Sequence, residues 1–267
     1  MPSAPSVPEL LADLAEEQAD LDALVDGIDE EQWATPTPAE GWTVRDQIGH
    51  LAFFDEMGRL AIEAPDGFSA RAQAAMEAAA EGRDPMAEHL ERGRAMTGAE
   101  VRAWWNTARA GFLAAAAGLS DDARVPWYGP PMSPRSFVSA RLMETWAHGQ
   151  DVADALGRSR TPTRRLAHVA QLGVRARPFS FAVRGLDAPA EDVRVELEGP
   201  SDETWTWGEE GAPGLVRGMA LEFCLVVTQR RHLDDTALVV EGDSAREWMA
   251  IAQAFAGPPG AGRPPSG

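Results

Sequence analysis

The sequence predicts an α+β protein in which a helix bundle over residues 1–184 precedes a small α+β domain over residues 185–256. Up to about residue 177, apolar residues recur every three or four positions, which is the period of amphipathic helices. Beyond residue 185, short stretches alternate between apolar and polar residues, as half-buried strands do. The tail over residues 257–267 is rich in Pro and Gly, and we expect it to be disordered.

Five helices with short connections are expected in the first part, and such helices pack as an antiparallel bundle. The second begins at Thr43, which forms a capping-box pattern with Asp46. The fourth has Ser133 at its N-cap, Pro134 at its first helical position and Gly157 where it stops. The helices are expected over residues 7–28, 43–65, 85–117 (with a break near residue 98), 133–157 and 162–177.

The second part reads as a small sheet with helices. Residues 193–198 and 203–208 alternate with period two, and the turn over residues 198–202 would join them as a hairpin. A helix over residues 214–229, a strand over residues 236–241 and a helix over residues 244–255 complete the expected α+β unit.

Composition narrows the classes of partner. A formal net charge of −18 over 267 residues argues against nucleic acids and anionic membranes as partners. No apolar run approaches the roughly 20 residues of a membrane span, and no signal peptide is recognisable. The single cysteine, Cys224, lies in an apolar run, so we expect a buried structural thiol and a reducing compartment. We therefore expect a cytoplasmic monomer or homodimer that acts on a small molecule.

The chemistry-bearing pattern is Glu144 with His148, four residues apart on one face of the expected fourth helix. A carboxylate and an imidazole at this spacing can chelate a divalent metal, and His50 on the second helix is the best candidate for a third ligand. The alternative is a surface salt bridge between Glu144 and His148. Asp151 continues the same stripe, where it would orient an imidazole, receive a proton or pair with a bundle arginine.

The remaining histidines carry less information. His89 stands among charged residues and is expected to be exposed. His168 is not assigned as a ligand. His232 follows Arg230 and Arg231, which makes it a further but weaker candidate for the site. The loop around Trp127 and Tyr128 precedes the fourth helix, where it could form a rim or lid.

Two segments of the bundle resemble a known family. Residues 41–51 (GWTVRDQIGHL) and 144–157 (ETWAHGQDVADALG) resemble the two signatures of the DinB-like, mycothiol-dependent maleylpyruvate isomerase superfamily. The C-terminal part resembles the sterol-carrier-protein-like α/β domain that accompanies this bundle. The resemblance implies a divalent metal, usually Zn²⁺, held by His50, Glu144 and His148, and mycothiol as a thiol cofactor. The donor set by itself suits several metals.

The resemblance also points to an arginine in the second domain. In the isomerase branch, such an arginine serves catalysis or thiol binding, and the matching stretch here is residues 225–231 (LVVTQRR). The usual pattern ends in Gly-Arg, but Gln229 takes the place of the glycine. We align Arg230 with the functional arginine, and Arg231 is the alternative. Both could instead form a solvated helix end, where basic residues are favoured.

The predicted function is therefore a metal- and thiol-dependent isomerase or transferase acting on a small unsaturated or electrophilic substrate. Two other classes remain open at this point. A metal-dependent hydrolase, or another enzyme that uses the metal as a Lewis acid, would need no thiol. A metal-binding ligand carrier would bind an apolar molecule in the second domain without turnover.

Overall fold

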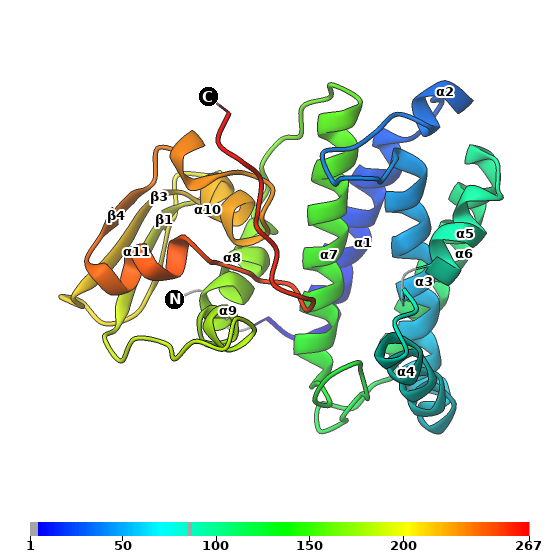
Figure 1. The fold of residues 1–267 in the computed structure, drawn as a ribbon, viewed down its shortest axis with the longest axis horizontal. Helices are drawn as coiled ribbons and strands as arrows, with labels where there is room; N and C mark the ends of the chain where they lie inside the picture. The colour runs from blue at the N-terminus through cyan, green and yellow to red at the C-terminus, as the bar shows by residue number, and fades with distance from the viewer. Residues whose placement is uncertain (1–4, 85–86, 267) are drawn as a thin grey trace. The chain divides into compact units, whose positions relative to one another are not determined.

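The computed structural model describes residues 5–84 and 87–266, and the chain forms two compact units. One unit spans residues 5–159, and the other begins at residue 160 (Figure 1). The first is helical and the second combines helices with a sheet, so the predicted α+β class is confirmed. No helix in the described ranges is long and apolar enough to cross a membrane.

Four long helices form the core of the first unit. Helix α3 packs on α6 and α7, and α1 packs on α7 and α6 (Figure 1). Fully buried side chains fill the space between them, among them Leu14, Leu51, Trp105, Phe112 and Leu142. The helices of this unit are α1 (Val7–Leu24), α2 (Glu30–Trp33), α3 (Val44–Glu63), α4 (Pro65–Ala80), α5 (Ala87–Arg94), α6 (Gly98–Ala116) and α7 (Pro134–Ala155).

Local sequence explains where these helices begin. The Thr43 side chain accepts a hydrogen bond from the backbone of Asp46, whose carboxylate bonds back to Thr43, so the predicted capping box of α3 is confirmed. Ser133 caps α7 as expected. The expected stretch over residues 85–117 is two helices, because Thr97 and Glu100 form a new capping box that starts α6. Residues 85 and 86 of that stretch lie outside the described residues.

The second unit is built on a four-stranded sheet in the order β2-β1-β3-β4. Strand β1 (Val193–Glu198) pairs antiparallel with β2 (Thr204–Trp207) and parallel with β3 (Gly214–Met219), and β3 pairs antiparallel with β4 (Val239–Glu241). The predicted hairpin is therefore confirmed. The helices are α8 (Leu166–Arg175), α9 (Arg177–Ala182), α10 (Ala220–Val227), a 3₁₀ turn (Leu233–Asp235) and α11 (Asp243–Met249).

The expected helix over residues 214–229 is wrong in its first third. Residues 214–219 form β3 because this segment pairs with β1 on one side and β4 on the other, which places Val216 in the core. The helix begins only at Ala220. Pairing with two neighbouring strands outweighs the helical period of the sequence.

The division between the units differs from the expected boundary at residue 184, since it falls between residues 159 and 160. The reason is that α8 packs on α10. A Cβ atom at Gly173 would lie 2.7 Å from the Val227 side chain, so the two helices touch closely at this glycine. The expected fifth helix thus belongs to the sheet-containing unit.

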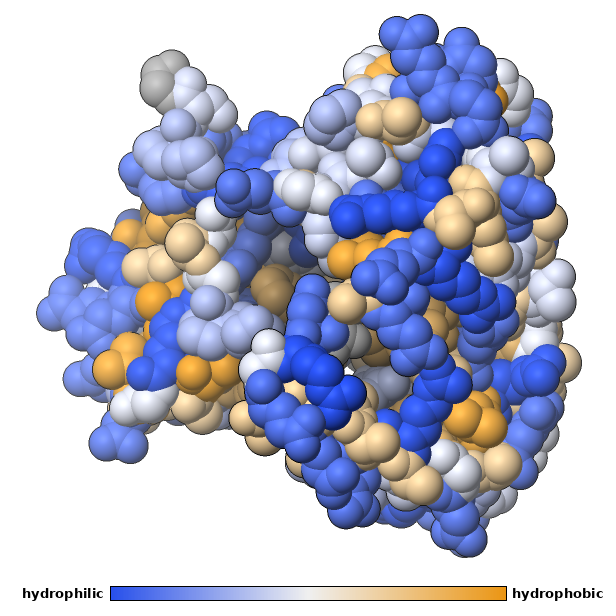
Figure 2. Space-filling view, turned by 45° about the vertical axis from the view of Figure 1, so that its right-hand side comes forward, coloured by the Kyte–Doolittle hydropathy of each residue, from blue (hydrophilic) through white to orange (hydrophobic). Residues whose placement is uncertain are grey.

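The described part of the tail, residues 257–266, was expected to be disordered; it has no helix or strand, but it makes hydrogen bonds within its own unit. Arg184 donates to the Gly260 carbonyl at 2.9 Å, and the Ser266 hydroxyl donates to Asp235 at 2.9 Å. Figure 2 shows hydrophilic residues over much of the visible face, with hydrophobic residues in separate patches, as the acidic composition leads one to expect.

Candidate metal centre

Helices α3 and α7 bring the three predicted ligands together. His50 lies in the second turn of α3, and Glu144 and His148 lie one turn apart on α7. One ligand atom from each residue lies within 4.8 Å of the other two. Both imidazoles are buried and the carboxylate is half-buried, so the group lies at the inner side of two packed helices.

The His148 ring is held at both nitrogens. Its Nε2 lies 3.2 Å from a carboxylate oxygen of Glu144, and its Nδ1 is hydrogen-bonded to the Gln47 side-chain oxygen. The Gln47 amide donates to the Thr37 hydroxyl at 2.9 Å, and that hydroxyl donates to the Trp42 carbonyl at 3.0 Å. Because an amide oxygen can only accept, Nδ1 carries a proton and donates to Gln47, which leaves Nε2 as the nitrogen that faces Glu144.

The His50 ring meets a residue that sequence reasoning placed elsewhere. Its Nδ1 lies 3.2 Å from Nε2 of His89, and His89 is almost completely buried. The prediction that His89 is exposed is therefore wrong. Burial lowers the pKa of His89 to about 4, more than nearby carboxylates raise it, so the ring is neutral at neutral pH.

The prediction for His89 was wrong because its charged neighbours form ion pairs with residues on other helices instead of facing only water. Glu88 pairs with Arg71, and Arg92 and Arg94 pair with acids on α3. The sequence did hold one sign of burial. Gly93 lies four residues after His89, on the same face of α5, and it packs against the backbone of Gly49, next to His50. Two small residues at a helix contact allow such a close approach.

Half-buried aromatic rings flank the two imidazoles. The Trp42 ring centroid lies 5.1 Å from that of His50 and 6.0 Å from that of His148. The Phe54 ring lies 4.6 Å from His50 on another side, and it also contacts the loop that carries Trp127 and Tyr128. These rings give the cluster an apolar surround, which strengthens polar interactions inside it.

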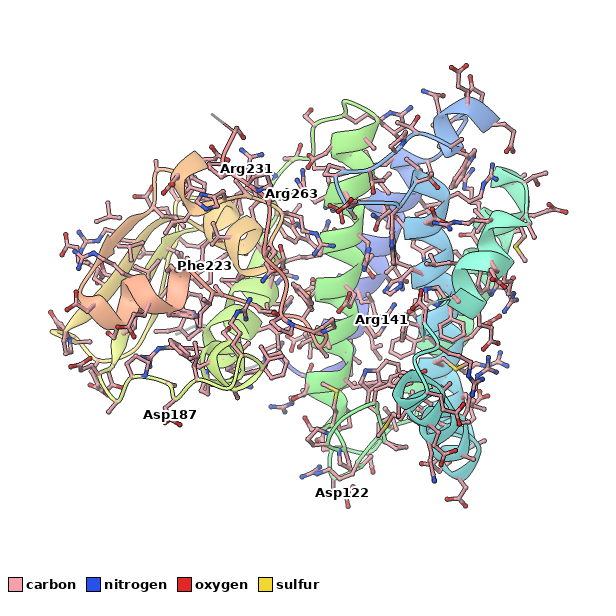
Figure 3. All side chains as sticks on the ribbon, in the orientation of Figure 1. Asp122, Arg141, Asp187, Phe223, Arg231 and Arg263 are labelled. Atoms are coloured by element: carbon pink, nitrogen blue, oxygen red, sulfur yellow. The ribbon has the colours of Figure 1, made fainter. Side chains whose placement is uncertain are left out.

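A buried ion pair ties α3 to α7 near the cluster. The Arg141 guanidinium, which extends from α7 toward α3 in Figure 3, lies 2.9 Å from the Asp55 carboxylate. Both side chains are almost fully buried. Burial raises the pKa of Asp55 above its ordinary value, and the positive charge of Arg141 opposes that rise. Asp151, the predicted catalytic carboxylate, is also buried on α7, one turn beyond His148.

The donor set fits a divalent cation. Two imidazoles and one carboxylate are the ligands of several catalytic zinc sites, and the second nitrogen of each imidazole already has a hydrogen-bond partner. His50, Glu144 and His148 could therefore hold a metal ion, while Gln47 and His89 contact the two histidines at their other ring nitrogens. No pattern in the sequence assigned Gln47, although it lies three residues before His50 and shares its helix face.

The predicted arginines lie in the second unit, just beyond the end of α10. Figure 3 labels Arg231 there, and the Arg230 guanidinium donates to the Thr228 carbonyl at 2.7 Å. Gln229 has a left-handed backbone with φ of 60°, the conformation in which a helix-ending glycine is favoured. Roles for Arg230 and Arg231 at the metal site stay predictions.

Two histidines and the cysteine of the second unit also have defined positions. His232 lies 3.5 Å from the Asp234 carboxylate within its own turn, and His168 lies on α8. Cys224 is fully buried and burial raises the pKa of its thiol far above the ordinary value, so the expected structural thiol is confirmed.

Comparison with known proteins places this arrangement in a family. The family model described as "Mycothiol maleylpyruvate isomerase N-terminal domain" matches residues 14–153. The "Uncharacterized protein MT0041" of Mycobacterium tuberculosis (strain CDC 1551 / Oshkosh) is 46% identical over 253 residues, which cover 95% of this chain and 97% of that protein. The "Uncharacterized protein Rv0036c" of strain ATCC 25618 / H37Rv matches equally well.

The fold has a counterpart among solved structures. The crystal structure of a mycothiol-dependent maleylpyruvate isomerase superposes with a TM-score of 0.56 at 17% identity, covering 85% of this chain and 90% of that one. A mutant of that enzyme gives the same TM-score at 16% identity. Together with the match over residues 14–153, these findings show that the chain belongs to the mycothiol-dependent maleylpyruvate isomerase superfamily.

Proposed function

We propose that this chain is a divalent-metal- and thiol-dependent enzyme of the maleylpyruvate isomerase type. Its substrate would be a small unsaturated or electrophilic compound, its metal Zn²⁺ and its thiol cofactor mycothiol. The observation that carries the proposal is the convergence of His50, Glu144 and His148 within 4.8 Å in the interior of the bundle. Membership of the family supports the thiol cofactor.

Three protein ligands suit a catalytic site better than a structural one, because structural zinc sites use four. When bound, such a metal lowers the pKa of a coordinated thiol and polarises a carbonyl oxygen. The residues of the chain prepare for this chemistry. Gln47 keeps a proton on His148 Nδ1, and the rings of Trp42 and Phe54 keep water from two sides of His50.

The proposed reaction is a thiol-assisted change of double-bond geometry. The thiol cofactor would supply a nucleophile that adds reversibly to a carbon–carbon double bond conjugated to a carbonyl, with the displaced electron pair held on the carbonyl oxygen. The former double bond could then rotate as a single bond. Return of the electron pair would break the C–S bond and release the thiolate, so the double bond would re-form in the other geometry without net oxidation.

Three further residues take proposed roles in this reaction. Arg230, or Arg231 in its place, would bind a substrate carboxylate or the thiol cofactor through its guanidinium and stabilise the enolate oxygen. Asp151, which is buried one turn beyond His148, would exchange a proton with the substrate, since Gln47 already holds the His148 nitrogen that a carboxylate could orient.

Elemental mass spectrometry of the purified protein tests the metal site. We expect about one equivalent of metal in the wild type, in line with a three-ligand zinc site, and none in His148→Ala. His168→Ala, which removes an imidazole from α8 in the other unit, is the matched control and should keep the metal. An absence of metal in the wild type after zinc repletion would refute the site.

Cobalt substitution tests the thiol. Adding a low-molecular-weight thiol to the Co²⁺ protein should shift its visible absorption, because a sulfur ligand changes the coordination. No shift, together with turnover of an ester or amide substrate without thiol, would favour a hydrolase instead.

A further inference from the structure

Helix α5 brings a third imidazole to the cluster, and neither the ligand set nor the sequence motifs include it. His89 Nε2 lies 3.2 Å from His50 Nδ1, with the ring centroids 5.2 Å apart. His89 is buried as deeply as the residues of the hydrophobic core. A polar ring at such depth requires an explanation, because burying polar groups costs stability.

When His50 binds a metal through Nε2, only one of the two rings can be the donor of this hydrogen bond. The coordinated ring then keeps its proton on Nδ1, so Nδ1–H donates and His89 Nε2 accepts. The proton of the neutral His89 ring must then be on Nδ1. That nitrogen is buried and has no hydrogen-bond partner among the described residues. The fold thus leaves one side of His89 unsatisfied while it satisfies the side that faces His50.

The position of His89 is fixed by the helix that carries it. Arg94 donates to the Asp46 carboxylate at 2.8 Å and to the Gly41 carbonyl at 2.9 Å, which ties the end of α5 to the start of α3. Arg92 bonds to Glu56 at 2.8 Å and lies over the Trp104 ring at 3.8 Å. These contacts in the last turn of α5 therefore hold the helix, and with it the His89 ring, against α3.

We propose that His89 is a positioning residue of the metal site. It accepts the Nδ1 proton of His50 and thereby holds the ring so that Nε2 faces Glu144 and His148. The inference rests on the metal site of the proposed function and adds to it the group that orients His50. Gln47 does the same for His148 with an amide oxygen, so the two histidine ligands are oriented by different chemical groups.

Zinc affinity, measured by competition with a chelator, tests this role. His89→Leu removes the acceptor at similar volume, and zinc affinity should fall about 10- to 100-fold, as for other groups that orient ligands. His89→Gln restores an acceptor oxygen on a side chain of similar reach, so it should recover most of the affinity. His168→Leu on α8 is the control and should change nothing.

The wild type separates the possible failures. If wild-type protein binds no zinc, the metal site itself is refuted. If the wild type binds zinc and both His89 variants bind it as tightly as the wild type, only the role of His89 is overturned. A readout without any variant is the ¹⁵N spectrum of the imidazoles in the zinc-loaded protein, which should show the proton of His50 on Nδ1. A proton on His50 Nε2 would contradict the proposal, even if His89→Leu failed to fold.

Discussion

The helix bundle and the sheet-containing unit bury different kinds of side chain. The buried polar residues of the second unit are mainly neutral side chains that bond to nearby backbone, and the described set there is Arg165, Ser180, Thr228, Ser244 and Gln253. The bundle buries many ionisable ones, namely Asp13, Glu17, Asp46, His50, Asp55, His89, Arg141, His148 and Asp151.

The difference shows which unit buries side chains that lower its free energy of unfolding. A buried ionisable group costs free energy unless it is paired, and replacing a pair by apolar side chains is often neutral or stabilising. The bundle nevertheless places four such groups between α3 and α7, where the candidate metal centre lies, namely His50, Asp55, Arg141 and His148. The second unit uses its interior for packing, for example the Phe223 and Trp248 rings, whose centroids are 5.9 Å apart.

The largest expected effect on stability comes from breaking the buried ion pair of the bundle. Arg141→Met should lower the free energy of unfolding by about 3–5 kcal/mol at neutral pH, because Asp55 is left buried without its partner. The double variant Arg141→Met with Asp55→Leu should recover much of the loss. Urea unfolding of the three proteins measures both effects. Equal stabilities for the single and double variants would show that the unpaired Asp55 carboxyl costs no stability.

The same variant has a defined pH dependence. Burial holds the pKa of Asp55 above its ordinary value of 3.8, and loss of Arg141 removes the charge that opposes this rise. A carboxyl whose pKa is higher in the folded than in the unfolded state favours folding as the pH falls. The destabilisation of Arg141→Met should therefore shrink from neutral pH toward the ordinary pKa of the carboxyl.

A second test uses zinc to separate the two units. Zinc at about 100 times its dissociation constant should add about 2.7 kcal/mol to the stability of the bundle, because it binds only the folded site. Hydrogen exchange should slow at the core amides of α3 and α7 and stay unchanged in α8 and α10. His148→Ala protein with zinc is the control. Equal slowing in the second unit would mean that the two units unfold together.

The smallest expected effect is at the end of α10. Gln229 has a left-handed backbone, which costs a residue with a Cβ atom about 1 kcal/mol relative to glycine. Its side chain also donates to the Ala252 carbonyl at 3.2 Å. Gln229→Gly relieves the backbone but loses that bond, so its stability should stay close to the wild type.

Gln229→Ala is the matched comparison, since it loses the bond and keeps the backbone conformation. Thermal unfolding should find it about 1 kcal/mol less stable than Gln229→Gly. Identical stabilities would show that the backbone at this position relaxes without cost.

Local signals made much of the site predictable. Thr43 and Ser133 cap α3 and α7, so the helices that carry His50, Glu144 and His148 could be placed from the sequence. Their apolar stripes then indicated which faces meet. The hairpin of β1 and β2 was predictable for a similar reason, because alternation and a turn are both short-range patterns.

The missed features depend on contacts between distant segments. Whether α8 belongs to the bundle or to the sheet is decided by its contact with α10, some fifty residues further along the chain. The strand β3 exists because β1 and β4 lie on either side of it. The burial of His89 depends on arginines that pair with acids on α3, and apart from Gly93 the local sequence shows only that charges are present.

The loop between α2 and α3 has a consequence for the site. The Thr37 hydroxyl bonds to the Trp42 carbonyl across this loop and also accepts from Gln47, which holds His148. One chain of hydrogen bonds therefore runs from a surface segment to a ligand of the candidate metal centre. If a metal occupies the centre and orders this loop, binding to the loop must affect metal affinity in return, because such linkage is reciprocal. A molecule that binds the loop at the surface and favours one arrangement of these hydrogen bonds would then change how tightly the candidate centre binds a metal.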